Sequence, residues 1–339
     1  MADKLKFGLV GCGNIGKRHA ELIRTFGILK AVCDNDSKKV NEYSKTYNVP
    51  GYTSFEILLN SSKEIDVIVI CTPNYLHAEQ SIAALEKGYH VLCEKPMALN
   101  VKDCEKMTEA AKRNQKTLLI VKQNRFNPPV VYLKSLLDSK KLGAIYSISM
   151  NCLWNRNEAY YNTSNWKGSK ELDGGILFTQ FSHFFDVACW LFGEMHCRSA
   201  SGKNFNHKEV TEFEDTVQAL VTFEKGILGC MHFSTNAYET NLEGSLTIIA
   251  EKGSIIIGGA YLNEITHHQA VSKVWPVLGE NKPANQYGSY TGSMSNHEDV
   301  YKHFLKSLKS EDFLYQDFAT SLQTIKAIES VLQALPNSN

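Results

Sequence analysis

Three polar side chains stand inside a strongly apolar segment of this sequence, "LDGGILFTQFSHFFDVACWLFG" at residues 172–193. If the segment is one helix with 3.6 residues per turn, Thr179, Gln180 and His183 share an apolar face. A polar group left unsatisfied in an apolar site costs about 1–3 kcal/mol, so the three side chains favour chemistry over packing. An imidazole with an ordinary pKa near 6.5 suits proton transfer at neutral pH. For His183 alone, a core histidine satisfied by its neighbours is the alternative.

A second candidate for chemistry is the glycine pattern "GCGNIG". Gly11 would permit a tight turn, Gly13 would let the backbone approach a pyrophosphate, and Gly16 would let a helix pack closely on a strand. The N-terminus of that helix offers free N–H groups and partial positive charge to phosphates. The pattern predicts a dinucleotide site, and a glycine-rich turn without a ligand is the alternative.

Asp34 lies 18 residues after Gly16, at the end of the second predicted strand. A carboxylate there accepts hydrogen bonds from both ribose hydroxyls of the adenosine and repels a 2′-phosphate. The sequence therefore predicts NAD in preference to NADP.

Two further motifs, "CTPNYLH" (71–77) and "CEKP" (93–96), end predicted strands. Thr72, Pro73 and Asn74 form a turn that can line the nicotinamide ribose. Pro96 disfavours helix at Lys95 and keeps it extended. An ammonium beside a nicotinamide can orient a substrate alcohol and stabilise negative charge on its oxygen. A solvated surface charge is the alternative for Lys95.

These motifs need elements to position them, and the first third of the chain supplies an alternation of strand and helix. Apolar runs at 5–11, 29–34, 66–72, 90–96 and 117–123 are separated by helical spacing. Such alternation predicts a doubly wound parallel sheet, a Rossmann fold, whose ligands bind beyond the carboxyl ends of the strands.

The second half begins with an amphipathic helix that ends at Gly143 and a strand at 144–154. Hairpins are expected at 215–234, turning at Lys225-Gly226, and at 244–259, turning at Lys252-Gly253. A length of 339 residues also favours two domains. We expect an NAD-binding domain over 1–122 and a substrate-binding and oligomerisation domain over 123–339.

Composition narrows the class of protein. Thirty-six basic and thirty-six acidic residues cancel, which argues against nucleic-acid or polybasic membrane partners. Neither a signal peptide nor an apolar run long enough to span a membrane is visible. Nine scattered cysteines without a CxxC pair favour reduced thiols in the cytoplasm. No metal is expected, because hydride transfer needs none and no ligand set has suitable spacing.

Together, GxGxxG, the acid after the second strand, "CTPNYLH" and "CEKPMALN" resemble the Gfo/Idh/MocA family of sugar oxidoreductases, and the resemblance covers the whole chain. It implies a C-terminal α/β domain whose open, mainly antiparallel sheet commonly forms the oligomer interface, so a homo-oligomer, a dimer or tetramer, is expected. It also implies His183 as general base and Lys95 as its catalytic partner on the same oxygen.

The resemblance further implies two sets of binding residues. The expected NAD-binding residues are Gly11, Gly13, Asn14, Ile15, Gly16, Asp34, Thr72, Pro73, Asn74, His77, Glu94, Lys95 and Gln123. The expected substrate-binding residues are Lys95, Arg156, Tyr161, Lys167, Thr179, Gln180 and His183. His297 resembles a family position near the substrate or the subunit interface, with a surface residue at a helix start as the alternative.

One residue departs from the family pattern. Many members carry Asp four residues before the histidine, where this chain has Thr179, so no carboxylate on that turn is placed to share the proton. Inositol-type and simple aldose dehydrogenases that use an Asp/His pair are therefore poorer matches.

Segments at 123–128, 155–175, 179–183 and 241–265 resemble the UDP-N-acetylglucosamine and UDP-N-acetylglucosaminuronate 3-dehydrogenases of bacterial polysaccharide or lipid A pathways. These oxidise the C3 hydroxyl of the sugar to a ketone. Tyr160, Tyr161 and Trp166 offer flat faces for a sugar or uracil ring. Arg156 and Lys167 suit a diphosphate or a C6 carboxylate. A surface loop with its aromatic rings packed inward is the alternative.

Two other functions remain open. One is a dehydrogenase of a free sugar or cyclitol in the same family, against which Thr179 and the 155–175 loop argue. The other is a dinucleotide-binding regulator without catalysis, against which Lys95 and His183 together argue.

Overall fold

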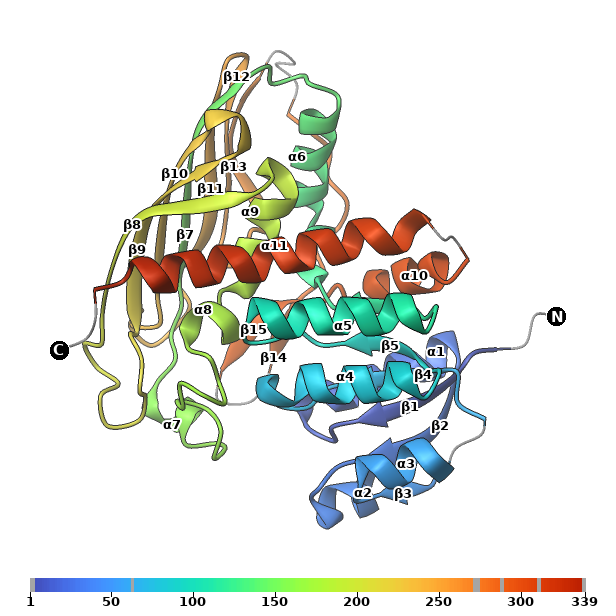
Figure 1. Ribbon diagram of the computed structural model, residues 1–339. Helices are drawn as coiled ribbons and strands as arrows, with labels where there is room; N and C mark the ends of the chain where they lie inside the picture. Colours follow the sequence, from blue (N-terminus) through green and yellow to red (C-terminus); the bar gives the residue numbers. More distant parts are fainter. Residues whose placement is uncertain (1–3, 62–63, 271–274, 287–289, 310–311, 337–339) are drawn as a thin grey trace. The chain divides into compact units, whose positions relative to one another are not determined.

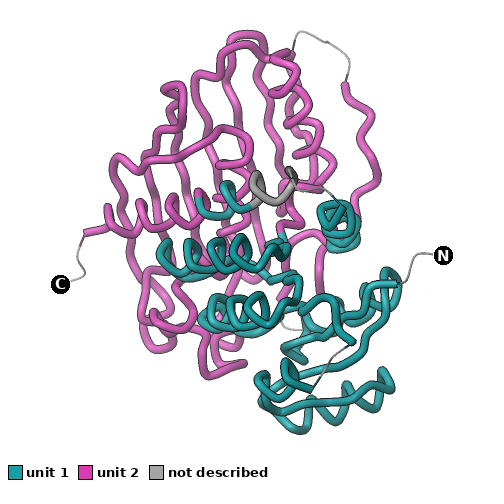
Figure 2. The backbone as a smooth tube through the Cα atoms, turned by 45° about the vertical axis from the view of Figure 1, so that its right-hand side comes forward, with its two compact units in different colours: residues 1–121, 297–322 teal, residues 122–296, 323–339 magenta. Residues whose placement is uncertain are grey.

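The computed structural model describes residues 4–61, 64–270, 275–286, 290–309 and 312–336. The chain divides into two compact units (Figure 2). Unit 1 comprises residues 1–121 and 297–322, and unit 2 comprises residues 122–296 and 323–339. The sequence placed a single boundary after residue 122, whereas the structure also assigns the segment 297–322 to unit 1.

Unit 1 contains a six-stranded sheet in the order β3-β2-β1-β4-β5-β6 (Figure 1). Every pairing in it is parallel, which confirms the predicted doubly wound sheet. The strands are β1 (Lys6–Val10), β2 (Ile28–Cys33), β3 (Gly51–Tyr52), β4 (Val67–Ile70), β5 (His90–Cys93) and β6 (Leu118–Ile120). The sequence missed β3, because two residues are too few to show a period.

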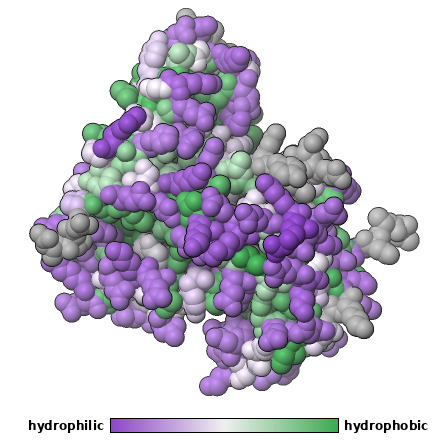
Figure 3. All heavy atoms as spheres, in the orientation of Figure 1, coloured by the Kyte–Doolittle hydropathy of each residue, from purple (hydrophilic) through white to green (hydrophobic). Residues whose placement is uncertain are grey.

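The helices of unit 1 are amphipathic layers on this sheet. They are α1 (Asn14–Phe26), α2 (Ser37–Tyr47), α3 (Phe55–Ser61), η1 (Asn74–Leu76), α4 (His77–Glu86), α5 (Val101–Arg113) and α10 (His297–Ser307). In α5, Cys104, Met107 and Ala111 are buried at helical spacing. Ala110 is buried beside them, while the lysines and glutamates of α5 are exposed. The molecular face in Figure 3 is mostly hydrophilic.

Unit 2 is built on a seven-stranded sheet in the order β13-β12-β11-β7-β10-β9-β8. Only β7 and β10 pair in parallel, so the mainly antiparallel sheet is confirmed. Its strands are β7 (Ile145–Leu153), β8 (Met195–Lys203), β9 (Thr216–Phe223), β10 (Leu228–Ser234), β11 (Glu243–Ala250), β12 (Gly253–Gly258) and β13 (Glu264–Ala270). The β9–β10 hairpin turns at Lys225-Gly226 as predicted. The β11–β12 hairpin turns at Glu251-Lys252, one residue earlier than predicted, because Gly253 pairs with Ala250.

The remaining elements complete unit 2, and α11 contributes to both units. They are η2 (Gln123–Phe126), α6 (Pro128–Asp138), α7 (Glu158–Tyr161), α8 (Ile176–Thr179), α9 (Ser182–Phe192), η3 (Glu224–Gly226), β14 (Ala284–Gln286), β15 (Thr291–Met294) and α11 (Asp312–Ala334). Phe233 on β10 packs against the rings of Phe181, Phe184 and Phe185. Burying each such side chain contributes about 1.5–3 kcal/mol, so this cluster holds α9 against the sheet.

Two chain-wide features bear on the sequence predictions. No helix among the described residues is both long enough and apolar enough to cross a membrane. All nine cysteines are free thiols. Burial, with the nearby Asp34 carboxylate, raises the pKa of the Cys12 thiol to about 12, so this thiol is unreactive at neutral pH.

Candidate active site

The candidate residues belong to both units and are described within each unit in turn. In unit 1, the glycine turn fits a dinucleotide. Gly11 has φ +98°, and a Cβ there would lie 2.5 Å from the carbonyl oxygen of Cys71. A Cβ on Gly16 would lie 2.0 Å from the carbonyl oxygen of Gly11. A Cβ on Gly13, the N-cap of α1, would meet nothing within 4 Å. The backbone is therefore closely packed at Gly11 and Gly16 and open at Gly13, where a pyrophosphate could approach it.

The Asp34 carboxylate is fixed by backbone groups at the end of β2. One oxygen accepts from the N–H of Cys12 at 2.7 Å, and the other accepts from the N–H of Asp36 at 2.9 Å. Since each carboxylate oxygen has two lone pairs, both can accept another hydrogen bond from a ribose hydroxyl. These residues fit NAD as the sequence predicted, and bound NAD would supply the hydride acceptor. Asn14 and Ile15 open α1 beside this turn.

His77 joins the two turns that follow β4 and β5. Its imidazole contacts the carbonyl oxygen of Pro96 at 2.7 Å and that of Thr72 at 2.9 Å. Burial lowers the pKa of His77, although both carbonyl contacts oppose that shift. The Thr72 hydroxyl donates to Gln80 at 2.7 Å, and Asn74 is buried at the start of η1. His77 therefore ties the turn carrying Thr72 to the residue that follows Lys95.

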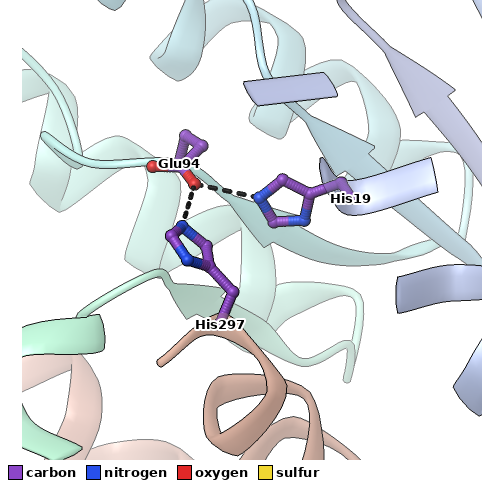
Figure 4. Close-up of side chains that lie close together, drawn as sticks. All are labelled: His19, Glu94 and His297. Atoms are coloured by element: carbon purple, nitrogen blue, oxygen red, sulfur yellow. Dashed lines mark hydrogen bonds and ion pairs between the residues drawn. The ribbon is translucent and has the colours of Figure 1, made fainter. Parts of the chain in front are cut away.

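Glu94 lies in a buried cluster with His19 of α1 and His297 of α10 (Figure 4). Its Oε1 is 2.9 Å from Nε2 of His19 and 3.4 Å from Nε2 of His297. Its Oε2 accepts from the N–H of Lys95 at 3.2 Å. Tyr301 of α10 contacts the other nitrogen of His19 at 2.9 Å. The cluster thus fixes the chain at the end of β5, immediately before the half-buried Lys95.

The cluster keeps its carboxylate ionised. Burial alone would raise the pKa of Glu94, but hydrogen bonds from His19 and His297 hold it well below its usual range. Burial lowers the pKa of His297, which favours its neutral form. His297 is 1% exposed, so the alternative that it is a surface residue at a helix start is wrong.

In unit 2, the segment expected to form one helix is two. α8 ends at Thr179 and α9 begins at Ser182, and the N–H of Phe181 bonds five residues back to Ile176 at 3.0 Å. Because of this break, Thr179 and Gln180 do not share one continuous helical face with His183, as the sequence had predicted. Protein groups contact each of the three polar side chains.

Asp173 accepts the hydrogen bond of the Thr179 hydroxyl through its carboxylate and, at 3.1 Å, through its backbone carbonyl. The helical turn itself carries no acid at this position, yet the preceding loop brings a carboxylate to it. Gln180 accepts from Nε of Arg156 at 2.8 Å and donates to the hydroxyl of Tyr160 at 2.6 Å. The loop 155–175 thereby satisfies both helix residues.

His183 is 6% exposed and contacts Gln123, the first residue of η2. The side-chain amide nitrogen of Gln123 lies 3.2 Å from Nε2 of His183 and donates to the Ser293 hydroxyl at 2.9 Å. A residue predicted to bind cofactor is thus placed against the predicted general base, within one unit.

A buried ion pair joins η2 to α9 close to this contact. Arg125 donates to both oxygens of Asp186, at 2.7 and 2.6 Å, and its guanidinium lies 5.2 Å from the centre of the Trp190 ring. Lys122 is 3.7 Å from the same carboxylate, which also accepts from the Thr324 hydroxyl at 3.3 Å. Because Gln123 and His183 lie on the two joined elements, this pair fixes their separation.

Arg156 and Lys167 form a cationic cluster among aromatic rings. Arg156 is 2% exposed, lies about 5 Å from the ring centres of Trp154, Tyr160 and Tyr290, and forms no ion pair with a carboxylate among the described residues. The ammonium of Lys167 is 4.0 Å from the centre of the Tyr160 ring. Burial, with Arg156 nearby, lowers the pKa of Lys167 to about 8, while Asp173 opposes the shift. The Arg156 guanidinium donates to neutral oxygens of Asn155, Gln180, Asn241 and Thr291. Its hydrogen bonds are thus made but no carboxylate offsets its charge, which favours an anionic ligand.

The aromatic rings of this loop pack inward. Tyr160 and Tyr161 are each 3% exposed, and their ring centres are 5.1 Å apart. Tyr161 also packs on His207. They line the interior of the loop and are not open flat faces on its surface.

Sequence reasoning missed His19, Asp173 and the Arg125–Asp186 pair. The signal for His19 was its place in α1, three residues after Gly16 and at helical spacing with Ile23. Asp173 stood directly before the two glycines of the 172–193 segment. Its partner Thr179 lies beyond the two glycines, and hydrophobic periodicity does not reveal a contact of this kind.

Comparisons with known proteins identify the family of this chain. Residues 5–122 match the family described as "Oxidoreductase family, NAD-binding Rossmann fold", and residues 130–256 match "GFO/IDH/MocA C-terminal domain". The chain belongs to the Gfo/Idh/MocA family, and it is an NAD-dependent oxidoreductase, as the sequence predicted.

Three relatives illustrate the range of the family. The WlbA dehydrogenase of Chromobacterium violaceum, solved with NADH and UDP-GlcNAcA, is 30% identical with a TM-score of 0.87, over 100% of this chain and 98% of that one. The WlbA dehydrogenase of Bordetella pertussis, solved with the same ligands, is 28% identical with a TM-score of 0.86, over 98% and 96%. Inositol 2-dehydrogenase of Salmonella paratyphi B is 29% identical over 56% of this chain and 55% of that protein.

Proposed function

We propose that this enzyme oxidises the C3 hydroxyl of a UDP-linked sugar, of the N-acetylglucosamine or N-acetylglucosaminuronate type, to a 3-keto sugar. The observation that carries the proposal is the pair of cations in the 155–175 loop. Arg156 is buried without a carboxylate ion pair in the described chain, and a diphosphate or a sugar carboxylate would compensate it. The two WlbA dehydrogenases, solved with UDP-GlcNAcA, support this substrate class.

In this proposal His183 accepts the proton of the sugar hydroxyl, and Lys95 donates a hydrogen bond to the same oxygen. Gln123 lies against Nε2 of His183 and orients the imidazole. The sugar hydroxyl takes the place of this amide when Nε2 accepts its proton. Glu94 anchors the backbone of Lys95. Fixing the reacting groups in this way lowers the entropic part of the barrier.

Dehydrogenation of a free sugar or cyclitol is the second candidate. The match to inositol 2-dehydrogenase favours it. A free cyclitol carries no anionic group, however, and would leave Arg156 and Lys167 uncompensated.

The proposal also places the enzyme in the cytoplasm, in polysaccharide biosynthesis, as a homo-oligomer. Its nine free thiols suit a reducing compartment. The pathway follows from the resemblance alone.

A panel of substrates tests the proposal. UDP-GlcNAcA, UDP-GlcNAc, free N-acetylglucosamine and myo-inositol are each incubated with the enzyme and NAD, and reduced nicotinamide is measured by absorbance. A nucleotide sugar should give the highest kcat/KM. Turnover of the free sugar or of inositol with no turnover of either UDP-sugar would contradict the proposal.

A further inference from the structure

The carboxylate of Asp173 is an unassigned group that joins two of the proposed substrate residues. Asp173 is 1% exposed. One of its oxygens accepts the proton of the Thr179 hydroxyl, and the other accepts from the N–H of Gly168 at 2.9 Å. Gly168 directly follows Lys167. A single buried carboxylate therefore contacts the end of α8 and the backbone beside the cationic cluster.

The first contact determines what Thr179 can bind. A threonine hydroxyl has one proton and two lone pairs. Because Asp173 accepts the proton, the hydroxyl of Thr179 can only accept from a further partner. A sugar hydroxyl or an amide N–H can donate to it, whereas a carboxylate or phosphate oxygen cannot. Thr179 is half-buried, so a ligand can reach it.

The second contact places the Asp173 carboxylate on the backbone of Gly168, the residue after Lys167, where its negative charge acts on the Lys167 ammonium. The groups that face its ammonium are the hydroxyl of Thr163 at 2.8 Å and the rings of Tyr160, Trp166 and Tyr290. The charged groups are Arg156, which favours loss of the lysine proton, and Asp173, which opposes that loss. Asp173 is the negative charge that acts on Lys167 in this arrangement.

We propose that Asp173 is a positioning residue with two effects, orienting the Thr179 hydroxyl to accept from a substrate hydroxyl or amide and keeping Lys167 charged for the anionic group. This inference rests on the proposed function. It predicts that Asp173 governs substrate affinity more than the chemical step, because neither effect touches the reacting oxygen.

The substitution Asp173→Asn tests both effects. Thr179 and Gly168 donate to different oxygens of Asp173. The asparagine amide replaces one of these oxygens by an NH2 donor, so one of the two hydrogen bonds is lost. Hydrogen bonds to charged groups contribute about 1.5–3 kcal/mol, so KM for UDP-GlcNAcA at pH 7 should rise about 10–100-fold. The kcat should change little, as expected when uniform binding is lost.

The pH profile gives a readout that a purely structural role would not move. In the wild type, KM for UDP-GlcNAcA should rise above about pH 8, where Lys167 loses its proton. In Asp173→Asn the rise should begin at lower pH, because the opposing negative charge is gone. Glu171→Gln is the matched control, an exposed carboxylate of the same loop, and it should leave KM and its pH profile unchanged.

Two variants of Thr179 keep the inference testable if Asp173→Asn does not fold. Thr179→Ser keeps the hydroxyl and should bind UDP-GlcNAcA like the wild type. Thr179→Val removes the hydroxyl and should raise KM about 10-fold or more, with the pH profile unchanged because Asp173 still acts on Lys167.

Activity of the wild type on UDP-GlcNAcA decides the proposed function, and only the ratio of variant to wild type decides the role of Asp173. Folded Asp173→Asn with wild-type KM and an unshifted pH profile would overturn the inference. So would Thr179→Val with a wild-type KM.

Discussion

At the residue scale, the role of Lys95 can be tested by removing its charge. Its side chain is half-buried while Glu94 beside it is buried against two imidazoles. Lys95→Met keeps the length of the side chain and removes its charge. Turnover should fall by about 10²–10⁴-fold, the range for an acid/base group, while NAD still binds in a calorimetric titration. The exposed Lys102→Met is the control, and near-normal turnover of Lys95→Met would remove Lys95 from the mechanism.

Asp34 should determine the choice of cofactor. Asp34→Ala removes the acceptor for the ribose hydroxyls and the charge that repels a 2′-phosphate. KM for NAD should rise, and discrimination against NADP should relax. Steady-state kinetics with both cofactors measure this effect. Asp34→Asn is the control that removes the negative charge but keeps the size of the side chain. A wild-type enzyme that reduces NADP as efficiently as NAD would show the assignment to be mistaken.

The sequence was most informative about residues whose role depends on a short local pattern. Gly11, Gly16 and Asp34 were predictable because the turn and the strand end are consecutive in sequence. The clustering of His19, Glu94 and His297 was not predictable. The two histidines are 278 positions apart, and helical spacing does not encode such a contact.

At the element scale, the 172–193 segment shows the limit of periodicity. Its apolar spacing suited one long helix, and the phenylalanines are buried as that pattern requires. The break at Gln180 and Phe181 arises because Gln180 bonds to Arg156 and Tyr160, both from a loop. Hydrogen bonds to distant residues thus determine where the helix is interrupted, which local helix propensity does not predict.

The Arg125–Asp186 pair should be the main attachment of α9 to η2. Removing one partner of a buried ion pair typically costs about 3–5 kcal/mol. Asp186→Asn should be more destabilising than Arg125→Met, because Asp186 contacts two cations and Thr324, and Arg125→Met leaves two of those contacts. Urea unfolding measures the midpoints. Equal midpoints for the wild type and Asp186→Asn would exclude this structural role.

At the scale of the whole molecule, unit 1 should lose stability on acidification. Burial lowers the pKa of His90 to about 4 and lowers that of His77 and His297. An unfolded histidine takes up its proton near pH 6.5. Between about pH 6.5 and 4 the unfolded state therefore binds more protons than the folded state, and the free energy of unfolding decreases as the pH is lowered. The ionised Glu94 adds stability above its unfolded pKa that is lost as pH falls further.

Calorimetric Tm values from pH 8 to 4.5 at fixed ionic strength test this dependence. The Tm should decline below about pH 6.5. His90→Asn should decline less steeply, because its amide oxygen can still accept from Thr117, as the His90 ring does now, and cannot titrate. A Tm that is constant or rises toward pH 4.5 would contradict the prediction.

The face of the unit 2 sheet that carries Leu220, Leu228 and Ile249 should form the oligomer interface. These side chains are 58%, 61% and 43% exposed, and a contiguous apolar patch of this kind marks an interaction site. The double variant Leu220→Asp with Leu228→Asp should lower the mass measured by light scattering. Leu242→Asp, exposed in the loop before β11, is the control. An unchanged mass would place the interface elsewhere or show that the wild type is a monomer.

The central claim, oxidation at C3 of a UDP-sugar, is tested most directly by isotope transfer. UDP-GlcNAcA carrying deuterium at C3 is incubated with the enzyme and NAD, and the reduced nicotinamide is analysed by mass spectrometry. The account predicts that the deuterium appears in the reduced cofactor, and that a matched substrate deuterated at C4 leaves its label in the sugar. Transfer of the C4 label, or reduction of the cofactor with the C3 label retained in the sugar, would contradict the account.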